Sequence, residues 1–172
     1  MLAQLIINDL AIISKLSLDF ESGMTVLTGE TGAGKSILLD ALGLILGDRA
    51  DTNIIRGNSE KTDITAIFFI KNNAAVIEKL KSIEIESNND ELFIRRTIRK
   101  DGRSRAYINN TPVPIQALRD IGEHLIEIHG QHAHQSLSQP KTQRELLDQF
   151  GQYNSILTST TKTYHELINI NN

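Results

Sequence analysis

The chain of 172 residues contains no cysteine. It therefore cannot form a disulfide framework or a zinc ribbon, and a fold of this length must depend on an apolar core. The absence of cysteine also fits a reducing compartment, so we expect a cytoplasmic protein. Long apolar runs are lacking as well, since no stretch approaches the roughly 20 residues that a membrane-spanning helix needs. We therefore expect neither a signal peptide nor a membrane anchor.

A strong excess of one charge is also lacking. The 18 lysines and arginines stand against 21 acidic residues, which gives a formal net charge of −3. Such a chain has no global attraction for nucleic acid, so binding to a phosphate backbone needs a local cluster of cations. The composition, 40% hydrophobic and 23% charged, is typical of a folded globular domain.

A glycine-rich segment near the N-terminus carries the most specific chemical signal. It satisfies the phosphate-loop pattern G-x-x-x-x-G-K-[ST]. We expect a short strand over residues 24–28 before it and a helix over residues 36–46 after it, ended by Gly47, which is the context that confirms this motif. The predicted nucleotide-binding residues are Gly29, Glu30, Thr31, Gly32, Ala33, Gly34, Lys35 and Ser36.

The residue types of this loop predict separate roles. Glycines let successive backbone N–H groups point inward, and the helix N-terminus adds partial positive charge, so an anion is the expected ligand. Lys35 is expected to reach the β- and γ-phosphates of ATP, and the Ser36 hydroxyl to ligate the Mg²⁺ that bridges them. ATP and Mg²⁺ are therefore the predicted cofactors.

The rest of the chain predicts an α/β fold. Two β-rich runs, residues 2–7 and 12–20, suit an antiparallel pair separated by Asn8-Asp9. Residues 64–70 are typical of a further strand, and residues 74–81 of a short helix. The predicted architecture is thus strands and helices in one chain, with antiparallel hairpins.

A basic hairpin is predicted around Asp101-Gly102, a pair favoured in two-residue turns, with strands over residues 92–100 and 103–109. Six of the eleven residues from 95 to 105 are lysine or arginine, and one is acidic. The two-residue turn sets a register in which four cations share one face beside Tyr107. Two interpretations stay open: contact with a DNA backbone, or a solvated hairpin whose charges protect a sheet edge. The candidate DNA-binding residues are Arg96, Lys100, Arg103 and Arg105.

The phosphate loop and several downstream stretches together resemble the RecN family of bacterial DNA repair proteins. These stretches are residues 46–51, Arg95-Arg96, residues 101–105, residues 107–109 and residues 128–135. RecN is similar to the SMC proteins, whose ATPase head has two lobes separated by a long antiparallel coiled coil. The implied fold is the N-terminal lobe of an SMC/ABC-type P-loop NTPase head, with a mixed β-sheet, antiparallel β-hairpins and the start of a coiled-coil helix.

The resemblance also implies a division of the chain and a further site residue. Residues 1–150 would form the N-terminal lobe, and residues 151–172 the start of a truncated coiled-coil helix. Gln131 would be the catalytic Q-loop glutamine, which contacts Mg²⁺ and the attacking water. The histidines beside it suit hydrogen bonds within that loop better than a metal site, because no cysteine or well-placed carboxylate completes a ligand set.

Elements of the second lobe are missing from the sequence. It contains no signature beginning Leu-Ser-Gly-Gly and no apolar strand leading to Asp-Glu. The carboxylate expected for hydrolysis is thus absent, so we expect an ABC/SMC-type ATP hydrolase with little activity in this chain alone.

The resemblance implies an ATP-binding half-head that acts in recombinational repair of DNA double-strand breaks. Its implied partners are the C-terminal lobe of the head, DNA through the full-length protein, and a second head in a homodimer. It would be cytoplasmic, and nucleoid-associated during repair.

Two alternatives belong to other classes of protein. A complete small P-loop kinase fits the length, with residues 48–56 as an acceptor site for a small metabolite, although a second acidic strand is lacking. A non-catalytic nucleic-acid or interaction module would make the phosphate loop vestigial, which the intact Lys35 and Ser36 argue against.

Overall fold

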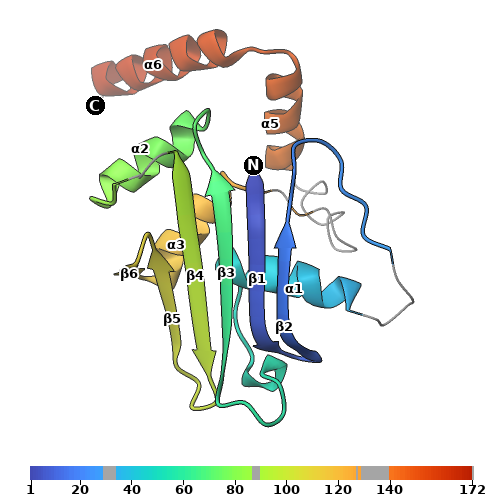
Figure 1. Cartoon of the computed structure of the whole chain (residues 1–172). Coiled ribbons are helices and arrows are strands. Elements are labelled where there is room, and N and C mark those ends of the chain that lie inside the picture. Colours follow the sequence, from blue (N-terminus) through green and yellow to red (C-terminus); the bar gives the residue numbers. More distant parts are fainter. Residues whose placement is uncertain (29–33, 87–89, 127, 129–139, 172) are drawn as a thin grey trace. The chain divides into compact units, whose positions relative to one another are not determined.

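The computed structural model of the chain describes residues 1–28, 34–86, 90–126, 128 and 140–171 (Figure 1). The chain divides into two compact units, Met1–Ile128 and His129–Asn172. In its described part, the first unit combines a β-sheet with helices, and the second is helical.

Six strands make up the sheet of the first unit within the described residues. They are β1 (Leu2–Leu10), β2 (Ile13–Asp19), β3 (Lys61–Phe69), β4 (Glu91–Arg99), β5 (Ser104–Ile108) and β6 (Thr111–Val113). Their order across the sheet is β2-β1-β3-β4-β5-β6, and every neighbouring pair is antiparallel. Most neighbours in the sheet are joined by short hairpins, which is why local sequence patterns located them well.

The predicted α/β fold is confirmed, but the described sheet is antiparallel rather than mixed. The strand expected over residues 24–28 does not form, and Met24 and Val26 are 91% and 67% exposed. A short apolar strand is stable when neighbouring strands pair with it and further layers bury its faces. No described element supplies these neighbours to residues 24–28.

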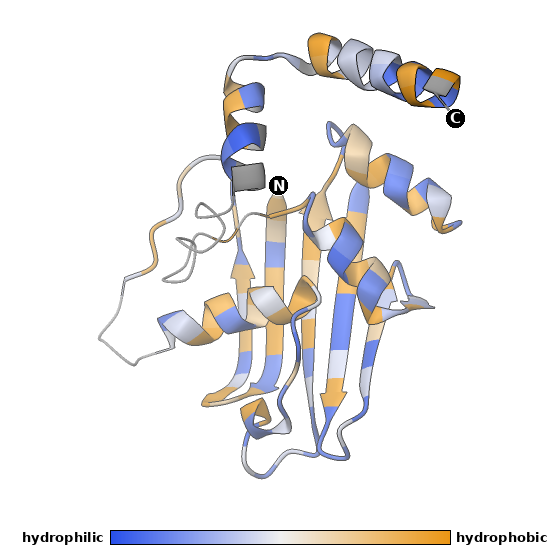
Figure 2. Ribbon diagram, turned by 180° about the vertical axis from the view of Figure 1, so that it is seen from behind, coloured by the Kyte–Doolittle hydropathy of each residue, from blue (hydrophilic) through white to orange (hydrophobic). Residues whose placement is uncertain are grey.

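Alternation along the strands separates two faces of the sheet. In β3 and β4 every second residue is buried, and the residues between them are exposed or half-buried. The buried face carries α1 (Lys35–Ile45) and α3 (Ile115–Gly122), which lie in front of the sheet in Figure 2. We call this the inner face, and the opposite face, turned to the viewer in Figure 1, the outer face.

The inner face holds the apolar core. Ala41, Leu44 and Ile45 of α1 are at most 5% exposed, so this helix buries one side against β1, β3 and β4. Burial of the two large aliphatic side chains, Leu44 and Ile45, each worth about 1.5–3 kcal/mol, helps to hold the helix on the sheet. The largest fully buried side chains include Leu5, Ile7, Ile64, Phe68, Leu92, Ile94 and Ile98.

Gly47 terminates α1 as predicted: the helix ends at Ile45, Leu46 is its C-cap, and Gly47 follows. Gly47 has a φ of 102°, a backbone conformation that residues with a Cβ rarely adopt. Its N–H donates to the Leu44 carbonyl at 3.2 Å, and the Asp48 N–H donates to the Gly43 carbonyl at 2.9 Å. This pair of hydrogen bonds is a Schellman motif, which satisfies carbonyls at the helix end.

The hairpin between β4 and β5 differs from the prediction in its turn. The Arg99 N–H donates to the Arg103 carbonyl at 2.9 Å, so three residues form the turn, and Gly102 takes its left-handed position with a φ of 82°. The ladder is shifted by one residue, which places Arg96 opposite Ala106. Because such a shift moves side chains to the other face, the predicted grouping of four cations on one face was wrong.

Outside the sheet, α2 (Ala74–Ser82) follows β3 as the sequence predicted. The second unit contains α5 (Pro140–Phe150) and α6 (Asn154–Asn171). The continuation of α6 into a coiled coil stays a prediction. No helix in the described ranges combines the length and the apolar character needed to cross a membrane.

Candidate nucleotide-binding site

The structure describes the last part of the predicted phosphate loop. Gly34, Lys35 and Ser36 lie at the start of α1, whereas Gly29, Glu30, Thr31, Gly32 and Ala33 lie outside the described residues. Gln131 and the histidines beside it also lie outside them. The site is therefore built here from the helix that begins at Lys35.

The N-terminal end of α1 faces solvent. Gly34 is its N-cap, with a φ of 100° and a ψ of −2°, and no described side chain caps the helix. Lys35 and Ser36 are exposed, and the first turn contains no acidic residue. The first N–H groups of a helix lack intrahelical partners and carry partial positive charge. This end thus offers N–H donors, a lysine and a hydroxyl, a set suited to phosphate with Mg²⁺.

The C-terminal end of α1 is held by a buried arginine from β4. Arg96 is 2% exposed. Its Nη1 donates to the carbonyls of Leu44 and Asp48, both at 2.6 Å, and its Nε donates to the Ser104 hydroxyl at 3.1 Å. A cation suits this position because helix C-termini carry unsatisfied carbonyls and partial negative charge. Arg96 thus fixes α1 on the sheet, and its burial removes it from the surface where DNA contact was predicted.

The surroundings of Arg96 shift the pKa of its guanidinium in opposing directions. Burial lowers the pKa of the Arg96 guanidinium, the Asp48 carboxylate opposes this, and the like charge of Arg119 adds to the lowering. Arg119, on α3, donates from Nη2 to the Gly47 carbonyl at 2.9 Å. Two arginines from different elements therefore contact the backbone where α1 ends.

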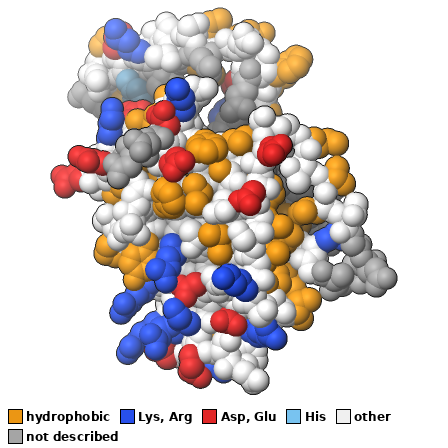
Figure 3. Space-filling model, viewed as in Figure 1, with side chains coloured by type: hydrophobic (Ala, Val, Ile, Leu, Met, Phe, Trp, Pro, Cys, Tyr) orange, Lys and Arg blue, Asp and Glu red, His pale blue; other side chains and the backbone are white. Residues whose placement is uncertain are grey.

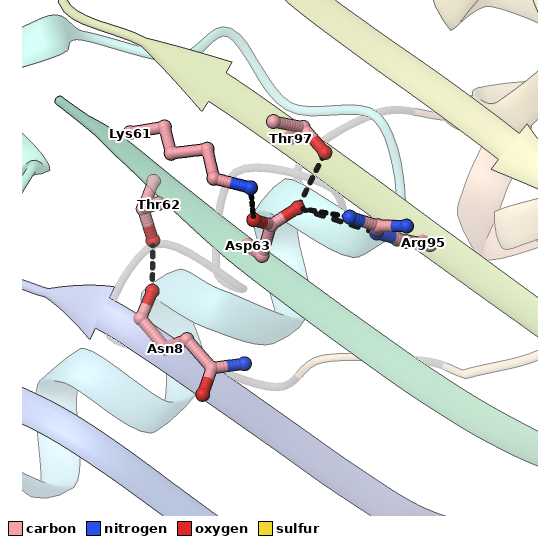
Figure 4. A network of polar contacts seen from close by, with 6 residues as sticks. All are labelled: Asn8, Lys61, Thr62, Asp63, Arg95 and Thr97. Atoms are coloured by element: carbon pink, nitrogen blue, oxygen red, sulfur yellow. Dashed lines mark hydrogen bonds and ion pairs between the residues drawn. The ribbon is translucent and has the colours of Figure 1, made fainter.

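On the outer face, Asp63 is the centre of a polar network (Figure 4). Its carboxylate accepts hydrogen bonds from Lys61 at 2.7 Å, Arg95 at 2.9 Å and Thr97 at 2.5 Å. Burial by itself would raise the pKa of Asp63, but the hydrogen bonds from Lys61, Thr97 and Arg95 outweigh it and hold that pKa below its usual value. Arg95 also lies over the ring of Tyr107, with 6.0 Å from Cζ to the ring centroid.

The other candidate DNA-binding cations lie apart from Arg96. Lys100 donates to the Gly57 carbonyl at 3.1 Å. Arg103 and Arg105 are exposed and line one shallow recess on the outer face. The structure therefore keeps Arg103 and Arg105 together and separates them from Arg96.

Sequence reasoning missed the role of Arg96 and the network of Asp63. A signal for the first was present, because Arg96 occupies the apolar phase of the alternation in β4, between Ile94 and Ile98. The network of Asp63 joins β3 and β4, and it depends on a strand pairing that the sequence did not reveal.

Solved structures share this arrangement of sheet and helices. The SMC head domain with an extended coiled coil from Pyrococcus furiosus, bound to the C-terminal domain of ScpA, has a TM-score of 0.71 and 19% identity; the match covers 98% of this chain and 46% of that one. A chain from work on ATP-driven dimerization and DNA-stimulated activation of SMC ATPases has a TM-score of 0.60 and 20% identity. The match covers 86% of this chain and 97% of that one. The fold is that of the N-terminal lobe of an SMC/ABC-type P-loop ATPase head.

Relatives in sequence narrow this class. The family model for the AAA domain matches residues 4–170. The DNA repair protein RecN of Vibrio cholerae is 46% identical over 164 residues, or 95% of this chain and 29% of the relative. RecN of Bacillus subtilis is 39% identical over 166 residues, or 96% of this chain and 28% of the relative. The chain belongs to the AAA domain family, as an N-terminal portion of a RecN-type protein.

The chain spans about three-tenths of the length of the curated relatives it matches. The predicted resemblance to RecN is confirmed. The alternative of a complete small-molecule kinase finds no support among these relatives.

Proposed function

We propose that this chain binds ATP with Mg²⁺ as the N-terminal half of the ATPase head of a RecN-type DNA repair protein. The observation that carries the proposal is the exposed start of α1, where Lys35 and Ser36 complete a phosphate-loop sequence. The inner-face packing and Arg96 hold the rest of that helix in place. A fixed helix N-terminus is pre-organised for an anion, because its N–H donors need no rearrangement on binding.

Each predicted residue of the site has a chemical role in this proposal. Lys35 supplies a positive charge to the β- and γ-phosphates, and the Ser36 hydroxyl is placed to ligate Mg²⁺, which supplies charge neutralisation when it is bound. Residues 29–34 contribute backbone N–H donors. Gln131 is the proposed contact of the metal and the attacking water, by resemblance to the Q-loop glutamine of the family.

The chain supplies only part of a catalytic site in this proposal. The apolar segment before the loop is exposed, with Met24 at 91% and Val26 at 67%, and it forms no described strand pair. Apolar surface of this kind is stabilised when a further layer covers it. We propose that the C-terminal lobe of the head supplies that layer, together with the carboxylate for hydrolysis.

A second head would then close over the nucleotide. One structurally similar chain comes from work on ATP-driven dimerization of SMC ATPases, which supports a head–head homodimer for this chain's full-length protein. The names of the relatives support a role in DNA repair. We propose the cytoplasm, and the nucleoid during repair, as the place of this role. In this arrangement the chain binds and orients the triphosphate, and turnover needs the partner surfaces.

The test is ATP hydrolysis by the chain alone and with the C-terminal portion of a RecN relative added in trans. We expect little turnover by the chain alone and a clear increase on addition, because the missing lobe brings the carboxylate. Lys35→Ala serves as the control and should abolish the increase. Full turnover without the added lobe, or phosphoryl transfer to a small metabolite by the chain alone, would contradict the proposal.

A further inference from the structure

The C-terminal end of α1 meets α3 on the inner face of the sheet with almost no side chain between them (Figure 2). An added Cβ at Gly122, the last residue of α3, would lie 3.0 Å from the carbonyl oxygen of Leu46 and 3.1 Å from its Cα. An added Cβ at Gly47 would lie 3.0 Å from the backbone nitrogen of Arg119. Carbon atoms in ordinary contact are about 3.5–4.0 Å apart. Two glycines therefore set the spacing between the end of α1 and α3 by contact of their backbones.

Hydrogen bonds hold the same contact. Arg119 donates from Nη2 to the Gly47 carbonyl at 2.9 Å. From the other side, Arg96 of β4 donates to the carbonyls of Leu44 and Asp48 at 2.6 Å. The end of α1 is thus held by both β4 and α3. We call the contact with α3 the α1–α3 joint, formed by Leu46, Gly47, Arg119 and Gly122.

The helix α3 is itself fixed on the sheet. Its side chains Leu118 and Ile121 are 0% and 1% exposed, and the helix contacts β5. A close-packed interior resists displacement of such a helix, because neighbouring side chains have little space to move. A methyl group added at Gly122 must therefore displace the end of α1 or the chain that follows α3.

The chain that follows α3 starts at the joint. The Gly122 carbonyl accepts hydrogen bonds from the N–H groups of Leu125 at 3.0 Å and Ile126 at 3.3 Å. Ile128 lines a recess of about 300 Å³ beside the joint. In the sequence, Gln131 is the third residue after Ile128. The joint thus fixes the described part of the chain that leads to Gln131.

The other side of the joint leads to the phosphate-binding end of α1. This helix has 11 residues and carries Lys35 and Ser36 in its first turn. Its backbone hydrogen bonds make it a stiff rod, so a displacement of its last turn also moves its first turn. The joint therefore sets the start of α1 relative to the point from which the chain continues toward Gln131.

We propose that Arg119 and Gly122 are positioning residues for ATP hydrolysis, which act through Gln131. The inference rests on the proposed function, in which Gln131 contacts Mg²⁺ and the attacking water. Binding of the triphosphate depends on the phosphate loop and Lys35, and both are unchanged in variants of the joint. The chemical step needs the water and the phosphate in one geometry, and a misplacement well below 1 Å already slows such a step.

The test compares Gly122→Ala with the matched control Gly57→Ala. Neither glycine has a positive φ, so alanine strains neither backbone. At Gly57 an added Cβ meets no atom within 4 Å. The kcat and KM for ATP are measured with the C-terminal portion of a RecN relative added. Affinity for a labelled ATP analogue and thermal unfolding are measured on each variant alone.

Gly122→Ala should lower kcat about tenfold, because its methyl group shifts the joint by a fraction of an ångström. The KM and the affinity for the analogue should stay at the wild-type values. Arg119→Ala should also lower kcat, and Arg119→Lys should recover part of the rate, since lysine keeps a charged donor for the Gly47 carbonyl. Gly57→Ala should keep the wild-type values throughout.

A double-variant cycle separates positioning from a general loss of structure. Single-turnover hydrolysis is measured for Gln131→Ala and for Gln131→Ala with Gly122→Ala. The second substitution should have no further effect in this pair, because the residue through which Gly122 acts is already removed. A general loss of structure would lower the rate by the same factor in both backgrounds.

Three results would overturn the proposal: a wild-type kcat in both Gly122→Ala and Arg119→Ala, a loss of analogue affinity that parallels the loss of kcat, or an equal loss of rate in the Gln131→Ala background. If Gly122→Ala does not fold, the two variants of Arg119 give the same readouts. No turnover by the wild type with the added lobe would overturn the proposed function, and this inference with it. Turnover by the wild type and by both α3 variants at one rate would overturn the inference alone.

Discussion

Adjacent arginines on β4 have opposite surroundings. Arg96 points to the inner face, is 2% exposed and donates to three oxygens. Arg95 points to the outer face, where its side chain is 51% exposed and pairs with Asp63. The position of each residue in the strand alternation sets this difference, because successive side chains point to opposite faces. A cluster of cations in sequence thus divides into one structural arginine and a charged surface.

The same division holds for the two faces as a whole. The inner face is covered by helices, and its buried polar side chains, Arg96 and Thr62, both have hydrogen-bond partners. The outer face carries the exposed side chains of Phe69 and Phe93 as well as a group of exposed cations that includes Arg95, Arg103 and Arg105 (Figure 3). We therefore expect substitutions on the inner face to lower the free energy of unfolding more than substitutions on the outer face.

The largest difference between the faces should appear in Arg96→Ala and Arg95→Ala. Arg96→Ala leaves the carbonyls of Leu44 and Asp48 without their charged donor, which should lower the free energy of unfolding by roughly 3 kcal/mol. Arg95→Ala removes an exposed ion pair and should cost less than about 1 kcal/mol. Urea unfolding followed by circular dichroism measures both. Equal losses would show that the two faces do not differ as described.

A smaller difference is expected between Gly47→Ala and Gly102→Ala. Both glycines have positive φ, 102° and 82°, so each alanine introduces backbone strain of about 1 kcal/mol. At Gly47 an added Cβ would also lie 3.0 Å from the backbone nitrogen of Arg119, whereas at Gly102 it meets open space. We expect a loss of about 2 kcal/mol for Gly47→Ala and about half of that for Gly102→Ala. Thermal unfolding of the two variants measures these losses. A greater loss of stability in Gly102→Ala than in Gly47→Ala would contradict the prediction.

The smallest effect should come from Asp63→Asn on the outer face. Because folding lowers the pKa of Asp63, its ion pairs stabilise the chain above the unfolded carboxyl pKa of about 3.9. That contribution is lost as the pH falls through the lower, folded pKa. The wild type should be more stable than the variant by about 0.5 kcal/mol at about pH 7, since the partners Lys61 and Arg95 are half exposed. The gap should shrink near pH 3.

Urea unfolding of wild type and Asp63→Asn at several pH values follows this gap. Glu91→Gln, on the same side of the sheet but without a described ion pair, is a matched control for the removal of one carboxylate. A gap that stays constant or widens as the pH falls would be inconsistent with a lowered pKa at Asp63.

Much of the fold could be predicted from periodicity, because most of its elements are local. The hairpin of β1 and β2 was expected, although its turn lies at Ala11-Ile12 rather than at Asn8-Asp9. The helix from Lys35 and its end at Gly47 followed from the phosphate-loop pattern and from a glycine after an apolar run. Such signals need only a few neighbouring residues.

The predictions were wrong where the structure depends on contacts between distant residues or on the detailed geometry of a turn. Asp101-Gly102 fits a two-residue turn, yet glycine also suits the last position of the three-residue turn that forms, and this choice sets the faces of Arg96 and Arg105. Residues 24–28 have the composition of a strand, but a strand needs partners, and the described part of the chain offers none.

The candidate site was predictable only in part. The eight residues of the phosphate loop followed from one specific pattern, and Lys35 and Ser36 lie at the helix start that this pattern requires. The contacts that fix the other end of that helix come from Arg96 on β4, about 50 residues later in the chain. No local pattern relates residues at that separation, so their contact emerged only from the structure.

The most direct test of the account is the affinity of the chain for a labelled ATP analogue, measured with and without Mg²⁺. Lys35→Ala should abolish detectable binding, Ser36→Ala should weaken it mainly when Mg²⁺ is present, and Lys79→Ala on α2 should leave it unchanged. These results would place the triphosphate at the start of α1. Equal affinity of the wild type and Lys35→Ala would contradict that placement.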